Sequence, residues 1–508
     1  MQTKYLHQVS PGIYYLDHRL TPEVRAMFCA MASRMPVGGI AARYTEVVGA
    51  VAEDLFQAWL ASNEATESLD KDPFFHEAED LLCSYPLHPK VLGFFDKFVA
   101  QYGHSSIMEL SGSPSVYIEG VSWYTAYLLF DNPLVAGQEF STRAVRHKDW
   151  PMARELMPSK GEMFNLHTEP GALEDYEAAY PFRELHDRWF EVFEAEVEAW
   201  KQRFSDPAVR KEYGISDNEP FRPALDRARW AIPGTIATGC SQTANIRVMA
   251  RVINDGSLLA QRAGCAAAVE TWDDIRAAYG AALPGMAGMG LREAVYDENA
   301  KIPGHLQILH IHSDKPEDEV LVSLLPNTTG VDPLAFSRDA GARAYVDPSL
   351  NGAGLVAVNI LCSLAVSRDW HRHRTFYPWR MYLIRDQGPI SIHPSYEPIS
   401  DLGKEKVPEL LRFSTRLYDK LMAEGDSYRA MMTLPLGTLV EMSAWGGLRD
   451  AIYMFELRAN AHGANFEYKA QAESALRQLR FYLQCVGGDV DYCDLTGLDP
   501  MFAGDHEE

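Results

Sequence analysis

The order of apolar and polar positions repeats along this chain. Near its start, the alternating run Ile13 to Asp17 predicts a short strand, and Thr21-Pro22-Glu23 has the Thr cap and early Pro typical of a helix start. The same order returns downstream, because His305 to His312 also alternates and Asp314 to Glu319 supplies Asp, Pro and Glu before the apolar run Val320 to Leu325. The pattern therefore predicts two copies of one strand-then-helix opening.

A second pair of similar blocks lies further along each copy. Arg229 to Arg247 and Leu434 to Arg449 both place an apolar residue before Pro, then Gly-Thr, and then an amphipathic segment that reaches an Arg. A long helix-like segment follows each block, at Leu258 to Ala282 and at Asn465 to Leu483. A tandem duplication is the simplest explanation of this order.

The duplication predicts the domain organisation. We expect a first repeat at residues 1–290, a second repeat at residues 300–495 and an acidic tail at residues 496–508. The first repeat carries a helical insert at about residues 174–204, whose aromatic residues recur at helical spacing. Such a stripe is more typical of a packed core than of a cofactor site.

Composition limits the classes of function. The chain has 508 residues, with 70 Asp+Glu against 47 Lys+Arg and a formal net charge of -23. This acidic excess argues against broad binding to nucleic acid or to an anionic membrane, and no apolar run approaches the roughly 18 residues of a membrane span. The start lacks the hydrophobic core of a signal peptide, and the 7 cysteines are scattered without C-x-x-C spacing. We therefore expect a cytoplasmic protein without a cysteine metal site.

One basic stretch contrasts with this acidic background. Ser367 to Arg380 reads S-R-D-W-H-R-H-R-T-F-Y-P-W-R and contains a single acid, Asp369. Such a cluster is typical of a site for an anion, such as a phosphate or a dinucleotide pyrophosphate, and the alternative is a solvated basic face. The apolar run Gly354 to Ala365 directly before it favours the anion site, because it places the cations at the end of a buried element.

Together with a second motif, this stretch resembles the flavin-dependent thymidylate synthase family, whose signature is R-H-R-x-x-S-x-N-E-x-S-x-R. Arg372-His373-Arg374 matches the first part of the signature, in the second repeat. Gln138-Glu139-Phe140-Ser141-Thr142-Arg143 matches the last part, in the first repeat, with Gln in place of Asn. Asp131-Asn132-Pro133 stands where R-H-R belongs in the first repeat. Neither repeat holds the whole signature, and together they nearly do.

The other ligand-contacting positions of the family are divided in the same way. The first repeat keeps Arg229, Asn245 and Arg247, and the second keeps Arg449 and Arg458. The resemblance implies that FAD is bound by Arg372, His373, Arg374, Asn245, Arg247 and Arg449. It implies that the substrate is bound by Gln138, Glu139, Ser141, Arg143 and Arg229. It also implies a catalytic contact between Arg458 and the pyrimidine.

The resemblance further implies a fold, an assembly and a reaction. The expected fold is α/β (α+β), with a mixed or antiparallel sheet and long helices in each repeat, and the chain is expected to form a homodimer that rebuilds a pseudo-tetramer. The expected reaction is C5 methylation or hydroxymethylation of a uridine nucleotide such as dUMP, with FAD as cofactor and methylenetetrahydrofolate and NADPH as co-substrates. The alternative is a catalytically inactive relative that retains a nucleotide or flavin pocket. No metal site is expected.

Overall fold

The computed structural model describes most of the chain. The described residues are 3–10, 13–32, 39–63, 72–101, 107, 110, 113–140, 151–168, 171–215, 221–282, 309–311, 320–325, 354–385, 388–460 and 465–485. Many helices and several small sheets make up this part of the chain, so the predicted α+β fold class is confirmed. None of the described helices is long and apolar enough to cross a membrane.

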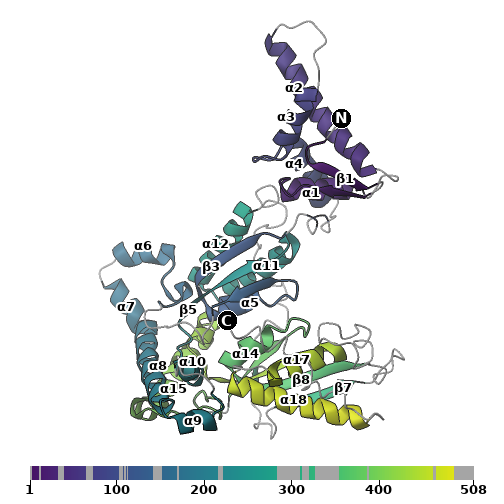
Figure 1. The fold of residues 1–508 in the computed structure, drawn as a ribbon. Helices are drawn as coiled ribbons and strands as arrows, with labels where there is room; N and C mark the ends of the chain where they lie inside the picture. Colours follow the sequence, from purple (N-terminus) through teal and green to yellow (C-terminus); the bar gives the residue numbers. More distant parts are fainter. Residues whose placement is uncertain are drawn as a thin grey trace.

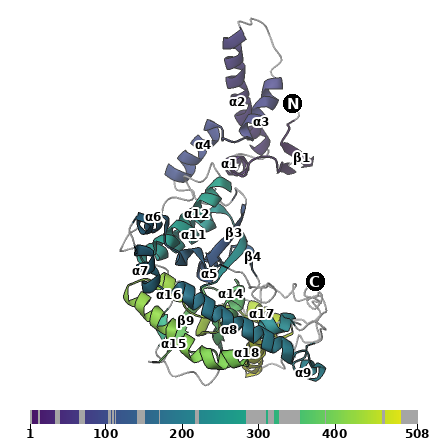
Figure 2. The ribbon, with the colours of Figure 1, turned by 90° about the vertical axis from the view of Figure 1, so that its left-hand side faces the viewer.

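The N-terminal elements form a module that stands apart from the other elements in both ribbon views (Figure 1, Figure 2). In it, β1 (Leu6–Ser10) pairs antiparallel with β2 (Ile13–Leu16). The Oγ1 of Thr21 accepts a hydrogen bond from the backbone N of Val24, where α1 (Pro22–Ala32) begins, so the predicted strand and helix start are confirmed. The module continues with α2 (Gly39–Asn63), α3 (Asp72–Leu82), α4 (Pro89–Phe95) and η1 (Asp96–Gln101).

The next part of the chain forms a three-stranded antiparallel sheet. Its order is β3 (Ser115–Ser122), β5 (Ala237–Thr243) and β4 (Ala136–Glu139). Directly after β3 comes α5 (Trp123–Leu129), and after β5 come α11 (Ile246–Arg262) and α12 (Ala266–Ala282). The single long helix predicted over Leu258 to Ala282 was wrong, because Gly264 adopts φ of 65° between the two helices.

A five-stranded sheet lies in the second half. Its order is β6 (Leu309–Ile311), β9 (Arg380–Ile384), β10 (Leu439–Gly447), β8 (Leu355–Ser363) and β7 (Val320–Leu325). Directly after β8 comes α14 (Leu364–His371), and after β10 come α17 (Leu448–Asn460) and α18 (Phe466–Cys485). The apolar run Val320 to Leu325, expected to follow a helix start, is a strand, because Val320 and Val322 alternate with exposed positions and pair with β8.

The two sheets share one arrangement of strands and helices. In each, a strand that ends in Ser pairs antiparallel with the strand that leads into two long helices, so that Ser122 lies opposite Ala237 and Ser363 opposite Leu439. Each serine caps the helix that follows. The Oγ of Ser122 accepts from the backbone N of Thr125 at 3.1 Å, and the Oγ of Ser363 accepts from the N of Val366 at 3.2 Å.

Helices and backbone hydrogen bonds join the two halves. α8 (Phe182–Arg203), within the predicted helical insert, packs along α15 (Asp401–Ala423), as Figure 2 shows. The aromatic stripe of α8 is buried, which confirms its predicted place in the core. The backbone N of Leu436 donates to the O of Ile232 at 2.9 Å, and the N of Gly437 donates to the O of Trp230 at 2.7 Å. The remaining elements are η3 (Arg154–Leu156), α6 (Lys160–Thr168), α7 (Ala172–Ala179), α9 (Pro207–Glu212), α10 (Phe221–Ala228), η4 (Arg229–Ala231) and α16 (Ser427–Met432).

Candidate functional site

The basic stretch begins inside α14 and continues past its C-terminal end. The N-terminus of α14 is held by Ser363, whose backbone N and Oγ both donate to the buried carboxylate of Glu467, each at 2.7 Å. This anchor places Arg368 and His371 in the last turn of the helix and Arg372 at its C-cap. Cations are favoured there, because the carbonyl groups at a helix C-terminus carry partial negative charge.

Glu139, at the end of β4, contacts two of these cations. Its carboxylate forms an ion pair with the buried guanidinium of Arg368. Its other oxygen lies 3.5 Å from Nη2 of Arg372, a side chain that is 44% exposed. Burial lowers the pKa of Arg368, and the charge of Glu139 opposes that shift. The two halves of the signature, separated by more than 200 positions in the sequence, therefore meet in the folded chain.

A second ion-pair group joins the halves beside the first. Arg229 is 1% exposed, and its Nη2 donates to Oδ2 of Asp369 at 2.9 Å, with Asp226 at 3.8 Å from its Nη1. Burial disfavours the charged guanidinium, but the two carboxylates outweigh it and the pKa of Arg229 is raised. Arg229 was predicted to bind substrate. In this arrangement Asp369 occupies its Nη2, while Nε and Nη1 are buried without a hydrogen-bond partner among the described residues.

His373, within the basic stretch, forms a close pair with Arg458 of α17. The Nε of Arg458 donates to Nε2 of His373 at 3.1 Å, which requires that nitrogen to be unprotonated. Burial, and then the positive charge of Arg458, lower the pKa of His373 to about 3. The Arg458 guanidinium also lies over the ring of Tyr468, 5.2 Å from its centroid. The imidazole is therefore a neutral acceptor that orients Arg458.

Arg374 differs from the other arginines of this region. Its side chain is partly buried, and burial lowers its pKa. Within the described residues no carboxylate lies within ion-pairing distance of Arg374. An anionic ligand would therefore meet a cation that the described part of the chain leaves without a counter-charge.

The other predicted site residues have diverse surroundings. Asn245 caps α11, because its Oδ1 accepts from the backbone N of Val248 at 3.0 Å. Arg247 is exposed on the first turn of that helix, and Gln138 is exposed on β4. Arg449 lies 3.8 Å from Asp450, at the start of α17. Ser141 and Arg143 lie outside the described residues, as do most of the predicted strand His305 to His312 and the predicted helix start Asp314 to Glu319.

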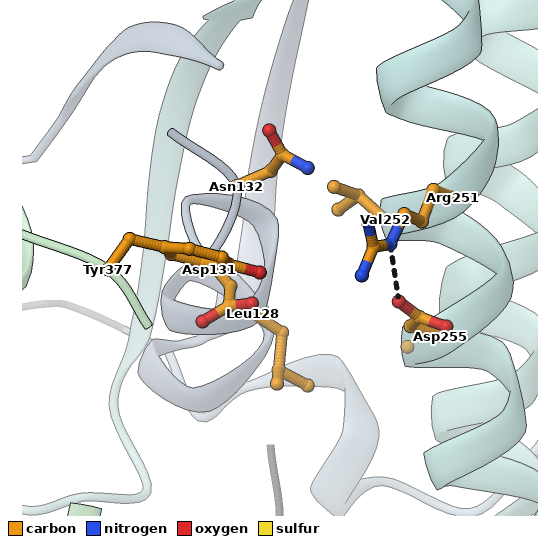
Figure 3. A pocket seen from close by; sticks show the side chains of 8 residues that line it. Leu128, Asp131, Asn132, Arg251, Val252, Asp255 and Tyr377 are labelled. Carbon is orange, nitrogen blue, oxygen red and sulfur yellow. Dashed lines mark ion pairs between the residues drawn. The ribbon is translucent and has the colours of Figure 1, made fainter. Parts of the chain in front are cut away.

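The first half carries different chemistry at the equivalent place. Asp131 lies nine residues after Ser122 in the first half, and Arg372 lies nine residues after Ser363 in the second. The strand residues opposite these serines are Ala237 and Leu439. Nineteen residues after them come Gly256 in the first half and Arg458 in the second. A pocket lies here, with a volume of about 10 Å³, which is room for about one water molecule (Figure 3). It is lined by Leu128, Asp131, Asn132, Arg251, Val252, Asp255, Gly256 and Tyr377.

The pocket is partly filled from the second half. Tyr377 reaches it from the segment after α14, and the Arg251 and Asp255 side chains lie 3.7 Å apart on α11 (Figure 3). Nearby, Nε2 of His371 lies 3.6 Å from Oδ1 of Asp131, and the His371 ring stacks on Tyr127 at a centroid distance of 3.9 Å. Sequence reasoning missed this role of Asp131. The signal was available, because an acid stands where the family has the first arginine of R-H-R.

The match to a known family lies in the second half of the chain. Residues 355–482 match the family model described as thymidylate synthase complementing protein. The matched region runs from β8 to α18 and includes Arg372, His373, Arg374, Arg449 and Arg458. It supports the resemblance to flavin-dependent thymidylate synthases for the second half, whereas the first half lies outside the match. No curated protein matches the chain.

Proposed function

We propose that the protein is a flavin-dependent enzyme that transfers a one-carbon unit to C5 of a uridine nucleotide such as dUMP. The observation that carries this proposal is the contact between Glu139 of the first half and Arg372 of the second, at 3.5 Å. In the family's signature, residues of these two types belong to one motif. Their meeting across the two halves, beside the region that matches the family model, supports one composite site.

The residues around Arg374 fit the phosphates of FAD. Arg374 has no carboxylate partner among the described residues, and Arg372 is 44% exposed, so both can donate charge-assisted hydrogen bonds to a phosphate. FAD, when bound in its reduced form, would supply the hydride that reduces a one-carbon unit donated by methylenetetrahydrofolate, and NADPH would then re-reduce the flavin. Asn245, Arg247 and Arg449 complete the proposed cofactor contacts.

Arg458 is the residue that we assign to the pyrimidine. His373 accepts from Nε of Arg458, and Tyr468 is a second hydrogen-bond partner of the guanidinium, so its remaining N–H groups would donate to a uracil carbonyl oxygen. Those donors would stabilise negative charge on the carbonyl oxygen as C5 becomes nucleophilic. Gln138, Glu139, Ser141, Arg143 and Arg229 are the proposed substrate-binding residues.

A second candidate function is a non-catalytic relative that retains the fold. The observation that favours it is the pairing of the buried arginines Arg229 and Arg368 with the chain's own carboxylates, Asp369 and Glu139. Such pairs stabilise the contact between the halves without any ligand. Activity measurements with dUMP, methylenetetrahydrofolate, FAD and NADPH separate the two candidates, because only the enzyme adds mass to the nucleotide.

The shared arrangement of the two sheets supports a tandem duplication in which the repeats have diverged. On this proposal one chain is a pseudo-dimer, and a homodimer of the chain restores a four-repeat assembly. Light scattering of the purified protein tests the assembly, since a monomer in solution would contradict it.

Arg374→Ala tests the cofactor site. Loss of one charge-assisted phosphate contact should weaken FAD binding by roughly 10- to 100-fold. Arg412→Ala is the matched control, because Arg412 is an exposed arginine on α15, outside the basic stretch. FAD affinity is measured by fluorescence titration, and circular dichroism checks the fold. Equal FAD affinity in the two variants would remove Arg374 from the site, and absence of FAD binding by the unmodified protein would refute the proposed function.

A further inference from the structure

The arginines where the two halves meet are neutralised by carboxylates of the same chain. Arg368 and Arg372 face Glu139, and Arg229 faces Asp369. Asp369 also lies 3.7 Å from Arg372, and Asp226 lies 3.8 Å from Arg229. Of the cations that the resemblance assigns to ligands, Arg229 and Arg372 therefore already lie near internal carboxylates, whereas Arg374 has no such partner within the described residues.

These ion pairs differ in how readily they can open. Arg229 and Arg368 are 1% and 6% exposed, and an uncompensated charge at either place would be costly. Arg372 is 44% exposed, and its carboxylate distances of 3.5 and 3.7 Å are longer than those of a hydrogen bond. Arg372 is thus the cation that can leave its internal partners and turn to a ligand in solvent.

We propose that Glu139 is an internal competitor for the anionic ligand, held against Arg372 until a phosphate group displaces it. This inference rests on the proposed function, since it concerns the same site. Glu139 belongs to β4 of the first half and Arg372 follows α14 of the second, so the exchange removes one contact between the halves. After the exchange, Glu139 remains paired with Arg368, which keeps the buried charge compensated.

Glu139→Gln tests the competition with inorganic pyrophosphate as the probe. The variant keeps the shape of the side chain and removes the charge that competes for Arg372. An ion pair of this exposure is weak, so pyrophosphate should bind about two- to fivefold more tightly in the variant, measured by calorimetry at low salt. Glu119→Gln is the matched control, because Glu119 is an exposed carboxylate on β3 of the same sheet and its loss changes the net charge equally.

The outcomes separate the inference from the function on which it rests. Tighter binding in Glu139→Gln but not in Glu119→Gln supports the competition. Equal pyrophosphate affinity in both variants and in the unmodified protein overturns it, while loss of binding in Arg374→Ala would still support the anion site. Absence of pyrophosphate binding in every protein overturns both the site and the competition.

A charge-conserving variant, Glu139→Asp, tests the competition if Glu139→Gln does not fold. Because Arg368 is buried against Glu139, Glu139→Gln can fail to fold. Glu139→Asp keeps one negative charge for Arg368 but has a side chain one methylene shorter, which draws the carboxylate back from Arg372. It should bind pyrophosphate about twofold more tightly than the unmodified protein, and unchanged affinity in a folded Glu139→Asp protein also refutes the competition.

Discussion

Acidification should destabilise the fold through His373. Its Nε2 accepts a hydrogen bond from Arg458, and burial together with the charge of Arg458 lowers its pKa from 6.5 to about 3. The folded chain therefore resists protonation of this imidazole, whereas the unfolded chain takes up the proton near pH 6.5. The unfolded state binds more protons between these pKa values. Stability contributed by the neutral imidazole is thus present above about pH 6.5 and is lost as the pH falls toward 3.

The size of the effect follows from the two pKa values. Full linkage between pH 7 and pH 5 gives about 2 kcal/mol, and because the ring is only partly buried we expect about 1 to 2 kcal/mol. Urea unfolding at both pH values measures the loss in the unmodified protein and in His373→Gln, which cannot titrate. His167→Gln is the control, because His167 is exposed on α6. If His373→Gln loses as much stability on acidification as the control, the neutral-imidazole reasoning is wrong.

Two further predictions concern the contact between the halves. Asp369→Asn should lower the free energy of unfolding, measured by urea titration, by about 2 to 3 kcal/mol, because it leaves the buried Arg229 with only Asp226 at 3.8 Å. Adding Arg229→Met should recover part of this loss, because it removes the buried charge. Gly234→Ala should cost about 3 kcal/mol or more, since its Cβ would lie 2.0 Å from the carbonyl oxygen of Leu434. Gly49→Ala, at a helical position with open space, should instead be neutral or stabilising by thermal unfolding.

Local sequence signals predicted the elements that depend on neighbouring residues. Thr21 and Pro22 begin a helix as expected, and the alternating run that starts at Ile13 forms β2. These features are readable because a cap or an alternating strand involves positions a few residues apart. The break at Gly264 and the strand at Val320 to Leu325 were missed. An apolar run fits a helix or a strand equally well until its pairing partner, here β8, is known.

The candidate site was predictable in its parts but not in its arrangement. The basic stretch with Arg372 and the motif with Glu139 were both recognisable as sequence patterns. Their contact depends on the antiparallel register of β4 with β5 and on the packing of one half against the other, which involve residues far apart in the chain. For the same reason Asp369 was recognised as the one acid of the basic stretch, but its pairing with Arg229, 140 positions away, was not predicted.

The charges at equivalent backbone positions distinguish the two halves. Nine residues after the capping serine, the second half has Arg372 and the first has Asp131. Nineteen residues after the strand residue that lies opposite this serine, the second half has Arg458 and the first half has Gly256. The side chains of an ionised acid and a glycine lack the hydrogen-bond donors that the two arginine side chains offer. A shared backbone arrangement therefore does not imply a shared ligand: at these equivalent positions the second half carries the two arginines, and the first half contributes the carboxylate of Glu139 beside Arg372.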